Sequence, residues 1–199
     1  MTQLQEFYQN HGLMVLDILG TLVGLLYLWL EYRASIKLWI VGLIMPTIYL
    51  FTYYKAGLYA DFGIQIYYLI VTAYGWFHWR FNSNGQTADL PITHAPRKFY
   101  PMALLAFSAA WIGIYFVLLR LTDCSVPFCD SFIAALSIIA LWMLARKYLE
   151  QWLAWMAVDT VCCALYVYKD IPFTAALYGL YALFAVAGFR KWKRLMSDY

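Results

Sequence analysis

The sequence predicts an all-α integral membrane protein, with seven transmembrane helices in a 3+1+3 arrangement of parallel repeats. Three observations lead to this fold class. Hydrophobic residues make up 64% of the chain and charged residues only 13%, whereas a soluble domain carries about 25% charged residues. Seven segments come close to the roughly 20 apolar residues that cross a bilayer as a helix. The third observation is an internal repeat that spans most of the chain.

Polar residues separate the seven apolar segments, which are expected at 13–31, 38–56, 62–79, 99–119, 131–148, 152–169 and 172–190. The fifth is the weakest, because Asp130 and Arg146 leave only fifteen uncharged residues between them. A long basic side chain at the end of a span can reach the headgroups, so this segment still qualifies. The polar stretch Arg80–Lys98 is expected to be the loop after the third span. Trp and Tyr gather at the span ends, as in an interfacial belt.

The basic residues predict the orientation of the spans. If the N-terminus lies outside, the outer segments hold only Lys55, Arg120 and Lys169, and the inner segments hold the other eleven of the fourteen Lys and Arg residues. Loops on the cytoplasmic side carry an excess of positive charge. We therefore expect a multi-pass protein of the cell inner membrane, surrounded by lipid, with a periplasmic N-terminus and a cytoplasmic C-terminus.

A shift of the sequence by 113 residues aligns identical residues from the first span to the last. The matched pairs are Asp17/Asp130, Leu28/Leu141, Trp29/Trp142, Arg33/Arg146, Trp39/Trp152, Thr47/Thr160, Tyr53/Tyr166, Tyr68/Tyr181, Gly75/Gly188 and Trp79/Trp192. Coincidence is the alternative, since the chain has nine Trp residues. The shift crosses an even number of spans, so the two halves run in the same direction and their pseudo-axis lies along the membrane normal.

The repeat predicts one transmembrane domain with three parts. These are a first three-helix repeat at 13–80, a linker helix at 99–120 and a second three-helix repeat at 130–193. In transporters built from such repeats, the substrate site lies between them near the bilayer midplane.

Asp159 is the main candidate for a functional group. It lies midway along the sixth predicted span, about 12 Å from either end at the helical rise per residue, and every Lys and Arg lies near a span end. An acidic side chain within the membrane is costly, and it marks a functional site by default. The alternative is a protonated acid that bonds to a neighbouring helix for structural reasons.

Aromatic residues share the predicted face of Asp159. Trp152, Trp155, Cys163 and Tyr166 follow helical spacing on either side of it. Aromatic faces beside a carboxylate suit a cationic ring, through stacking and cation–π attraction. An aromatic packing seam is the equal alternative.

The third predicted span carries a second stripe, formed by Gln65, Tyr68, Thr72, Trp76 and Trp79. Its polar members offer hydrogen bonds that a ribose or a carboxamide can use. The repeat matches these positions with Tyr178, Tyr181, Ala185, Phe189 and Trp192, and it matches Asp159 with Pro46. This indicates a symmetric frame with an asymmetric lining, which suits an asymmetric ligand. Pro46 is also expected to kink the second span.

The sequence lacks the residues that several classes of membrane protein require. The chain has no GxxxxGK[ST] loop for ATP, no mid-span Lys for retinal, and its three His residues fall at span ends or in loops. No span interior holds a Lys or Arg that could neutralise a phosphate, so a neutral or cationic ligand is expected. We predict no enzyme activity, no catalytic residue, no cofactor, no metal and no nucleic-acid partner. Cys124 and Cys129, in an outer loop, form either a disulfide or two free thiols.

Three stretches resemble a known family. These are IQIYYLIVTAYGWFHW at Ile64–Trp79, YLEQWLAWMAVDTVCCALYVYKDI at Tyr148–Ile171 and ALYGLYALFAVAGFRKW at Ala176–Trp192. They resemble the third, sixth and seventh helices of the PnuC family of nicotinamide riboside transporters. SWEET-type sugar carriers share the architecture.

The resemblance implies facilitated diffusion of nicotinamide riboside, a vitamin B3 form and NAD precursor, by a homotrimer. It points to Gln65 and Tyr68 in the third span and to Trp152, Trp155, Asp159 and Tyr166 in the sixth. With the stripe of the third span, the predicted substrate-binding residues are Gln65, Tyr68, Thr72, Trp76, Trp152, Trp155, Asp159 and Tyr166. The alternative is a transporter of another vitamin, nucleoside or sugar with the same fold.

Overall fold

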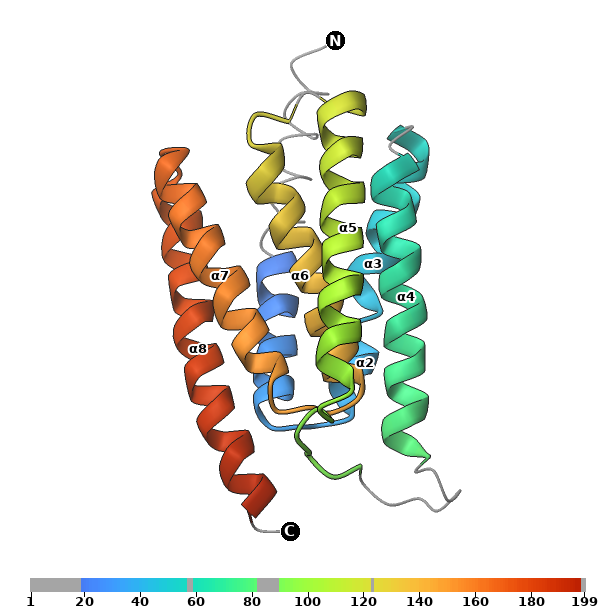
Figure 1. Cartoon of the computed structure of the whole chain (residues 1–199), viewed down its shortest axis with the longest axis vertical. Coiled ribbons are helices and arrows are strands. Elements are labelled where there is room, and N and C mark those ends of the chain that lie inside the picture. Colours follow the sequence, from blue (N-terminus) through green and yellow to red (C-terminus); the bar gives the residue numbers. More distant parts are fainter. Residues whose placement is uncertain (1–18, 57–58, 82–89, 123, 198–199) are drawn as a thin grey trace. The chain divides into compact units, whose positions relative to one another are not determined.

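The computed structural model describes residues 19–56, 59–81, 90–122 and 124–197, and the described part of the chain is built from helices without a β-strand. An apolar helix at Leu19–Tyr32 comes first. Seven labelled helices follow: α2 (Lys37–Val41), α3 (Ile44–Ala56), α4 (Tyr59–Arg80), α5 (Phe99–Leu121), α6 (Pro127–Ala145), α7 (Gln151–Tyr168) and α8 (Pro172–Ser197) (Figure 1).

The helices fall into two compact units, divided within α4 between Trp76 and Phe77. In the second unit, α5 packs on α6, α6 on α7, and α7 on α8. Figure 1 shows α7 and α8 side by side along their length. By length and composition α5, α6 and α8 can each cross a membrane. Over the length that crosses a membrane, the helices with the predicted polar stripes, α4 and α7, are less apolar than these three, because they are rich in polar and aromatic residues.

The structure corrects three of the predicted spans. The second is two helices, because a turn at Gly42 and Leu43 interrupts the α-helix. Pro46 explains this break: a proline ring clashes with the carbonyl four residues earlier, here that of Gly42.

The fifth span is α6, which begins at Pro127 instead of residue 131 and ends at Ala145 instead of residue 148. Proline is favoured in the first turn of a helix because it has no N–H to leave unpaired. The seventh span continues beyond residue 190 to Ser197, and Arg194 lies in its last turn, where a cation is favoured.

Matching geometry recurs at the predicted spacing of 113 residues. The helix Leu19–Tyr32 and α6 each end in a Schellman motif whose left-handed residue is Ala34 (φ 51°) in one and Lys147 (φ 58°) in the other. The N–H of Ser35 donates to the Leu30 carbonyl at 2.9 Å, and that of Tyr148 donates to the Met143 carbonyl at 3.0 Å. The backbone hydrogen bonds of these two corners therefore match at this spacing.

Two side-chain contacts recur at the same spacing. Arg33 lies 4.8 Å from the ring centroid of Trp29, and Arg146 lies 5.8 Å from that of Trp142. Trp39 packs so closely on Gly75 in the first unit that a Cβ at that glycine would overlap its ring, and a Cβ at Gly188 in the second unit would lie 2.6 Å from the Trp152 ring. The matched tryptophans thus fill matched glycine notches. The pair Asp17/Asp130 has no such comparison, because Asp17 lies outside the described residues.

Candidate functional site

Asp159 lies in the middle of α7 and is 8% exposed. The carboxylate makes no ion pair with any of the described residues. A buried carboxylate without a cation is unfavourable. A cationic ligand would supply the missing charge, which is why this position remains the main candidate of the second unit.

α8 contributes two tyrosines to the electrostatic environment of this carboxylate. Tyr178 and Tyr181 both lie within electrostatic range of Asp159. The Tyr178 ring stacks on that of Tyr166, with centroids 5.3 Å apart and planes inclined by 13°, and meets the Tyr181 ring edge-on at 5.8 Å. α7 and α8 thus bring Asp159 and three tyrosines into one cluster, which we call the tyrosine cluster: Asp159, Tyr166, Tyr178 and Tyr181.

Tyr178 and Tyr181 are absent from the predicted site. The sequence contained a signal for them, because the repeat matches them with the candidates Gln65 and Tyr68. Tyrosine offers both an aromatic face and a hydroxyl.

The tryptophans of α7 lie in different surroundings. Trp152 is fully buried between Gly188 and Trp192, where it packs edge-on at 5.6 Å from the Trp192 ring centroid. Trp155 is half-buried, and its indole N–H finds no hydrogen-bond partner among the described residues. The Trp152 indole N–H also lacks a partner among these residues, so the two tryptophans differ in burial and packing and not in their donors.

The predicted residues of α4 belong to the first unit. Thr72 is buried, and its methyl group lies 3.6 Å from where a Cβ of Gly42 would be, beside the break between α2 and α3. Tyr68 is half-buried with its ring 5.8 Å from that of Tyr67. Gln65 and Trp76 are half-buried as well. These four residues lie on α4 in the first unit, whereas the tyrosine cluster belongs to the second.

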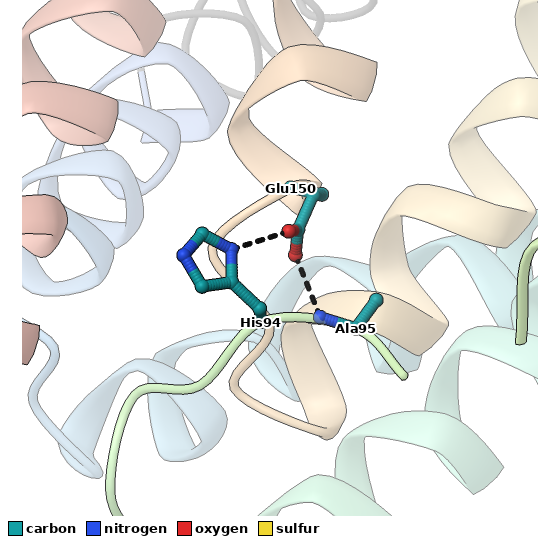
Figure 2. Close-up of polar contacts among 3 residues, drawn as sticks. All are labelled: His94, Ala95 and Glu150. Atoms are coloured by element: carbon teal, nitrogen blue, oxygen red, sulfur yellow. Dashed lines mark hydrogen bonds and ion pairs between the residues drawn. The ribbon is translucent and has the colours of Figure 1, made fainter. Parts of the chain in front are cut away.

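A polar contact fixes the loop before α5 to the turn between α6 and α7. Glu150 accepts hydrogen bonds from the backbone N–H of Ala95 at 2.9 Å and pairs with His94 Nδ1 at 2.7 Å (Figure 2). Thr93 adds a parallel bridge to Tyr148. Burial alone would raise the pKa of Glu150, but the Ala95 N–H and the His94 ring together lower it below its ordinary value. We call this contact the loop clasp.

Cys124 lies before α6, and Cys129 lies in the first turn of α6 and not in the predicted loop; both are free thiols. Cys124 Sγ donates to Asp130 Oδ2 at 3.0 Å. Burial and this hydrogen bond raise the pKa of the Cys124 thiol. Of the two sequence alternatives, the structure contains the free thiols.

The chain as a whole is similar to known membrane transporters. The family model described as nicotinamide mononucleotide transporter matches residues 14–194. The nicotinamide riboside transporter PnuC of Escherichia coli is 26% identical, over 92% of this chain and 87% of that protein. The riboflavin/roseoflavin transporter RibM of Streptomyces davaonensis is 27% identical, over 88% of this chain and 83% of that protein. A crystal structure of the vitamin B3 transporter PnuC matches with a TM-score of 0.64 at 17% identity, covering 100% of this chain and 94% of that one. The last likeness is evidence for the fold alone.

Proposed function

Since the chain belongs to the nicotinamide mononucleotide transporter family, we propose that it carries nicotinamide riboside across the cell inner membrane by facilitated diffusion with alternating access. Its apolar helices and its family make it a multi-pass membrane transporter. The choice of substrate follows the names of its relatives and the chemistry of the site. The family description names the mononucleotide, and one relative is named for riboflavin, so these compounds are the competing substrates.

The observation that carries the proposal is the buried carboxylate of Asp159, which pairs with no cation among the described residues and lies within electrostatic range of two tyrosines. Nicotinamide riboside is a cation with an aromatic ring, ribose hydroxyls and an amide. Its pyridinium would pair with the carboxylate and stack on tyrosine, while the hydroxyls would bond to tyrosine oxygens. Riboflavin is neutral and would leave the carboxylate without a counter-charge. The mononucleotide adds a phosphate, which this carboxylate would repel.

The proposed binding site joins the two predicted stripes. From the second unit it takes Trp155, Asp159 and Tyr166, with Tyr178 and Tyr181 added on structural grounds, and Trp152 supports it from its notch. Gln65, Tyr68, Thr72 and Trp76 of α4 would contribute from the first repeat. This assignment rests on the seven-span, 3+1+3 architecture, which the recurring corners support.

The remaining parts of the proposal come from charge and resemblance. The basic residues favour a periplasmic N-terminus and a cytoplasmic C-terminus. The resemblance to PnuC proteins implies a homotrimer. No ion gradient is required, because a cation already responds to the membrane potential.

Uptake into proteoliposomes tests this function. At 100 mV, inside negative, a single charge gains about 2.3 kcal/mol, or roughly fifty-fold accumulation. Nicotinamide riboside should accumulate under the potential alone, and riboflavin and the mononucleotide should not. Uptake that needs a proton gradient at zero potential would reject the uniport mechanism. Equal uptake of the mononucleotide would reject the assigned site.

A further inference from the structure

A second aromatic group lies in the second unit, away from the tyrosine cluster. Its rings belong to Trp79, Trp152 and Trp192, at the end of α4, the start of α7 and the last turns of α8. The Trp192 ring is 6.3 Å from the Trp79 ring and 5.6 Å from the Trp152 ring. All three are buried. They therefore form a buried aromatic group centred on Trp192, which we call the tryptophan layer.

A lysine covers one ring of this layer. Lys147 Nζ lies 4.5 Å from the centroid of the Trp79 ring, and the residue is only 6% exposed. The same ring is held in place by its indole N–H, which donates to the Ala145 carbonyl at 3.2 Å. A positioned ring with an ammonium on its face is a cation–π site that is already occupied.

The backbone at Lys147 does not explain the choice of lysine. Its φ of 58° is left-handed, and the matched position of the first corner has Ala34 in the same conformation. Glycine is the residue that this geometry favours. Alanine meets the backbone requirement as well as lysine does, so the long cationic side chain indicates a role beyond the turn.

The position of the layer relates it to transport. Trp79 and Trp192 are matched by the repeat, and equivalent residues of a twofold repeat can touch only close to its axis. In transporters with parallel repeats that axis lies along the membrane normal. The layer lies at the ends of α4 and α8, which the charge distribution assigns to the cytoplasmic side.

We infer that the face of Trp79 is a cytoplasmic exit subsite for the cationic ring of the substrate and that Lys147 competes with the substrate for it. The inference rests on the proposed function and orientation. With no substrate present, the ammonium of Lys147 occupies the ring and keeps the layer closed. A pyridinium arriving from the membrane interior displaces it, whereas a neutral ring gains no cation–π attraction. Lys147 is thus a specificity-determining residue.

The test compares a cationic and a neutral substrate from the cytoplasmic side. Right-side-out membrane vesicles are loaded with nicotinamide riboside or with its neutral dihydro form, and the half-saturation concentration of efflux is measured. Lys147→Met should lower this concentration for the cation about three- to tenfold, since the ring face is vacated. The dihydro form should be unchanged. Lys147→Arg keeps a cation on the ring and should restore the wild-type ratio of the two substrates.

Arg146→Met is the matched control, because it removes one neighbouring cation whose ring partner is Trp142. It should leave the ratio of the two half-saturation concentrations unchanged. An equal shift for both substrates in Lys147→Met, or a higher value for the cation, would overturn the inference. If Arg146→Met reproduces the shift, charge at a distance explains it, and the ring contact is refuted.

Thermal melting of each variant identifies a loss of folding. Should Lys147→Met fail to fold, Lys147→Gln provides the same loss of charge with a polar end. Wild-type vesicles that transport neither substrate would refute the proposed function itself. Transport by the wild type without a selective shift would refute only the role of Lys147.

Discussion

Residues 29–42 and residues 142–155 fold into matching corners in different units. The two corners nevertheless have different polar side chains at matched positions. Both corners have a left-handed residue after the first helix and a buried tryptophan on a glycine of a later helix. The first corner places Ala34 and Leu38 where the second has Lys147 and Gln151. Leu38 and Gln151 are both fully buried. The frame is thus shared, while each corner buries a polar residue of its own: Glu31 in the first, where the second has Leu144, and Gln151 in the second.

The buried side chain of Gln151 lowers the stability of the second corner. Neither its amide oxygen nor its nitrogen has a hydrogen-bond partner within the described residues. A buried amide without a partner costs about 1–3 kcal/mol, and leucine at the matched position has no such cost. A sequence optimised only for stability would have leucine in both corners. Gln151 is therefore a polar residue that the fold does not require.

The glycine notches should give the largest effects on stability in both halves. Gly75→Ala and Gly188→Ala place a methyl group against a fixed indole ring, and overpacking of this kind costs about 1–3 kcal/mol. Thermal melting in detergent measures the loss. Gly63→Ala, on the same helix as Gly75, is the control, because a Cβ there meets open space.

Gly179→Ala is the corresponding control on α8, with a Cβ at an ordinary 3.6 Å from Cys163. Both controls should be neutral or gain up to about 1 kcal/mol, since alanine favours a helix more than glycine does. A notch variant that melts like its control would show that the indole moves aside easily. If this happened in only one half, the two corners would not be mechanically equivalent.

The loop clasp should have a smaller effect, confined to the second corner. The matched residue of Glu150 is Lys37, which cannot accept these bonds. Glu150→Gln weakens the bonds to Ala95 and His94 by about 1 kcal/mol. Hydrogen exchange at the Ala95 amide should quicken about fivefold, the rate change that corresponds to this energy.

The clasp also has a defined pH dependence. The pKa of Glu150 is lower in the folded protein than its ordinary value. Its contribution is therefore fully present above the ordinary pKa and is lost as the pH falls through the folded pKa. After correction for intrinsic exchange, Ala95 protection should fall with acid in the wild type and not in Glu150→Gln. Equal acid sensitivity in both proteins would assign the effect to another group.

The left-handed residues should give the smallest effects. Ala34→Gly relieves the strain of a Cβ at positive φ and should raise stability by about 0.5 kcal/mol. Lys147→Gly relieves the same strain but loses the contact with Trp79, so it should gain less or lose stability. Melting curves of the two variants provide the comparison. An equal gain in both would mean that the Lys147 contact contributes nothing to folding.

Much of the frame could be predicted because membrane helices and repeats leave strong sequence signals. The pairs Arg33/Arg146 and Gly75/Gly188 recur as matched contacts in the structure. Helix ends were harder to predict. The break at Gly42 depends on a steric clash with Pro46, and the end of α6 depends on a left-handed lysine that no propensity scale favours.

The candidate site was only partly accessible to sequence reasoning. Asp159 is conspicuous because a charge in a membrane helix is rare. Tyr178 and Tyr181 are inconspicuous among eighteen tyrosines, and only packing of α8 on α7 brings them beside Asp159. The opposite holds for Trp152, which shares a helical face with Asp159 but is inserted in a glycine notch. Spacing along one helix cannot predict what the neighbouring helix presents.

The central claim is that the second half of a symmetric frame provides the anion that binds the substrate. Equilibrium titration of purified protein with nicotinamide riboside tests it most directly, with Asp159→Asn compared with wild type. Asparagine keeps the shape and loses the charge, so a charge-assisted bond worth about 1.5–3 kcal/mol disappears and affinity should fall roughly ten- to a hundredfold. Asp170→Asn, the same change at an exposed turn residue, should bind like wild type. If Asp159→Asn is folded and binds the riboside with wild-type affinity, the carboxylate is structural and the claim is wrong.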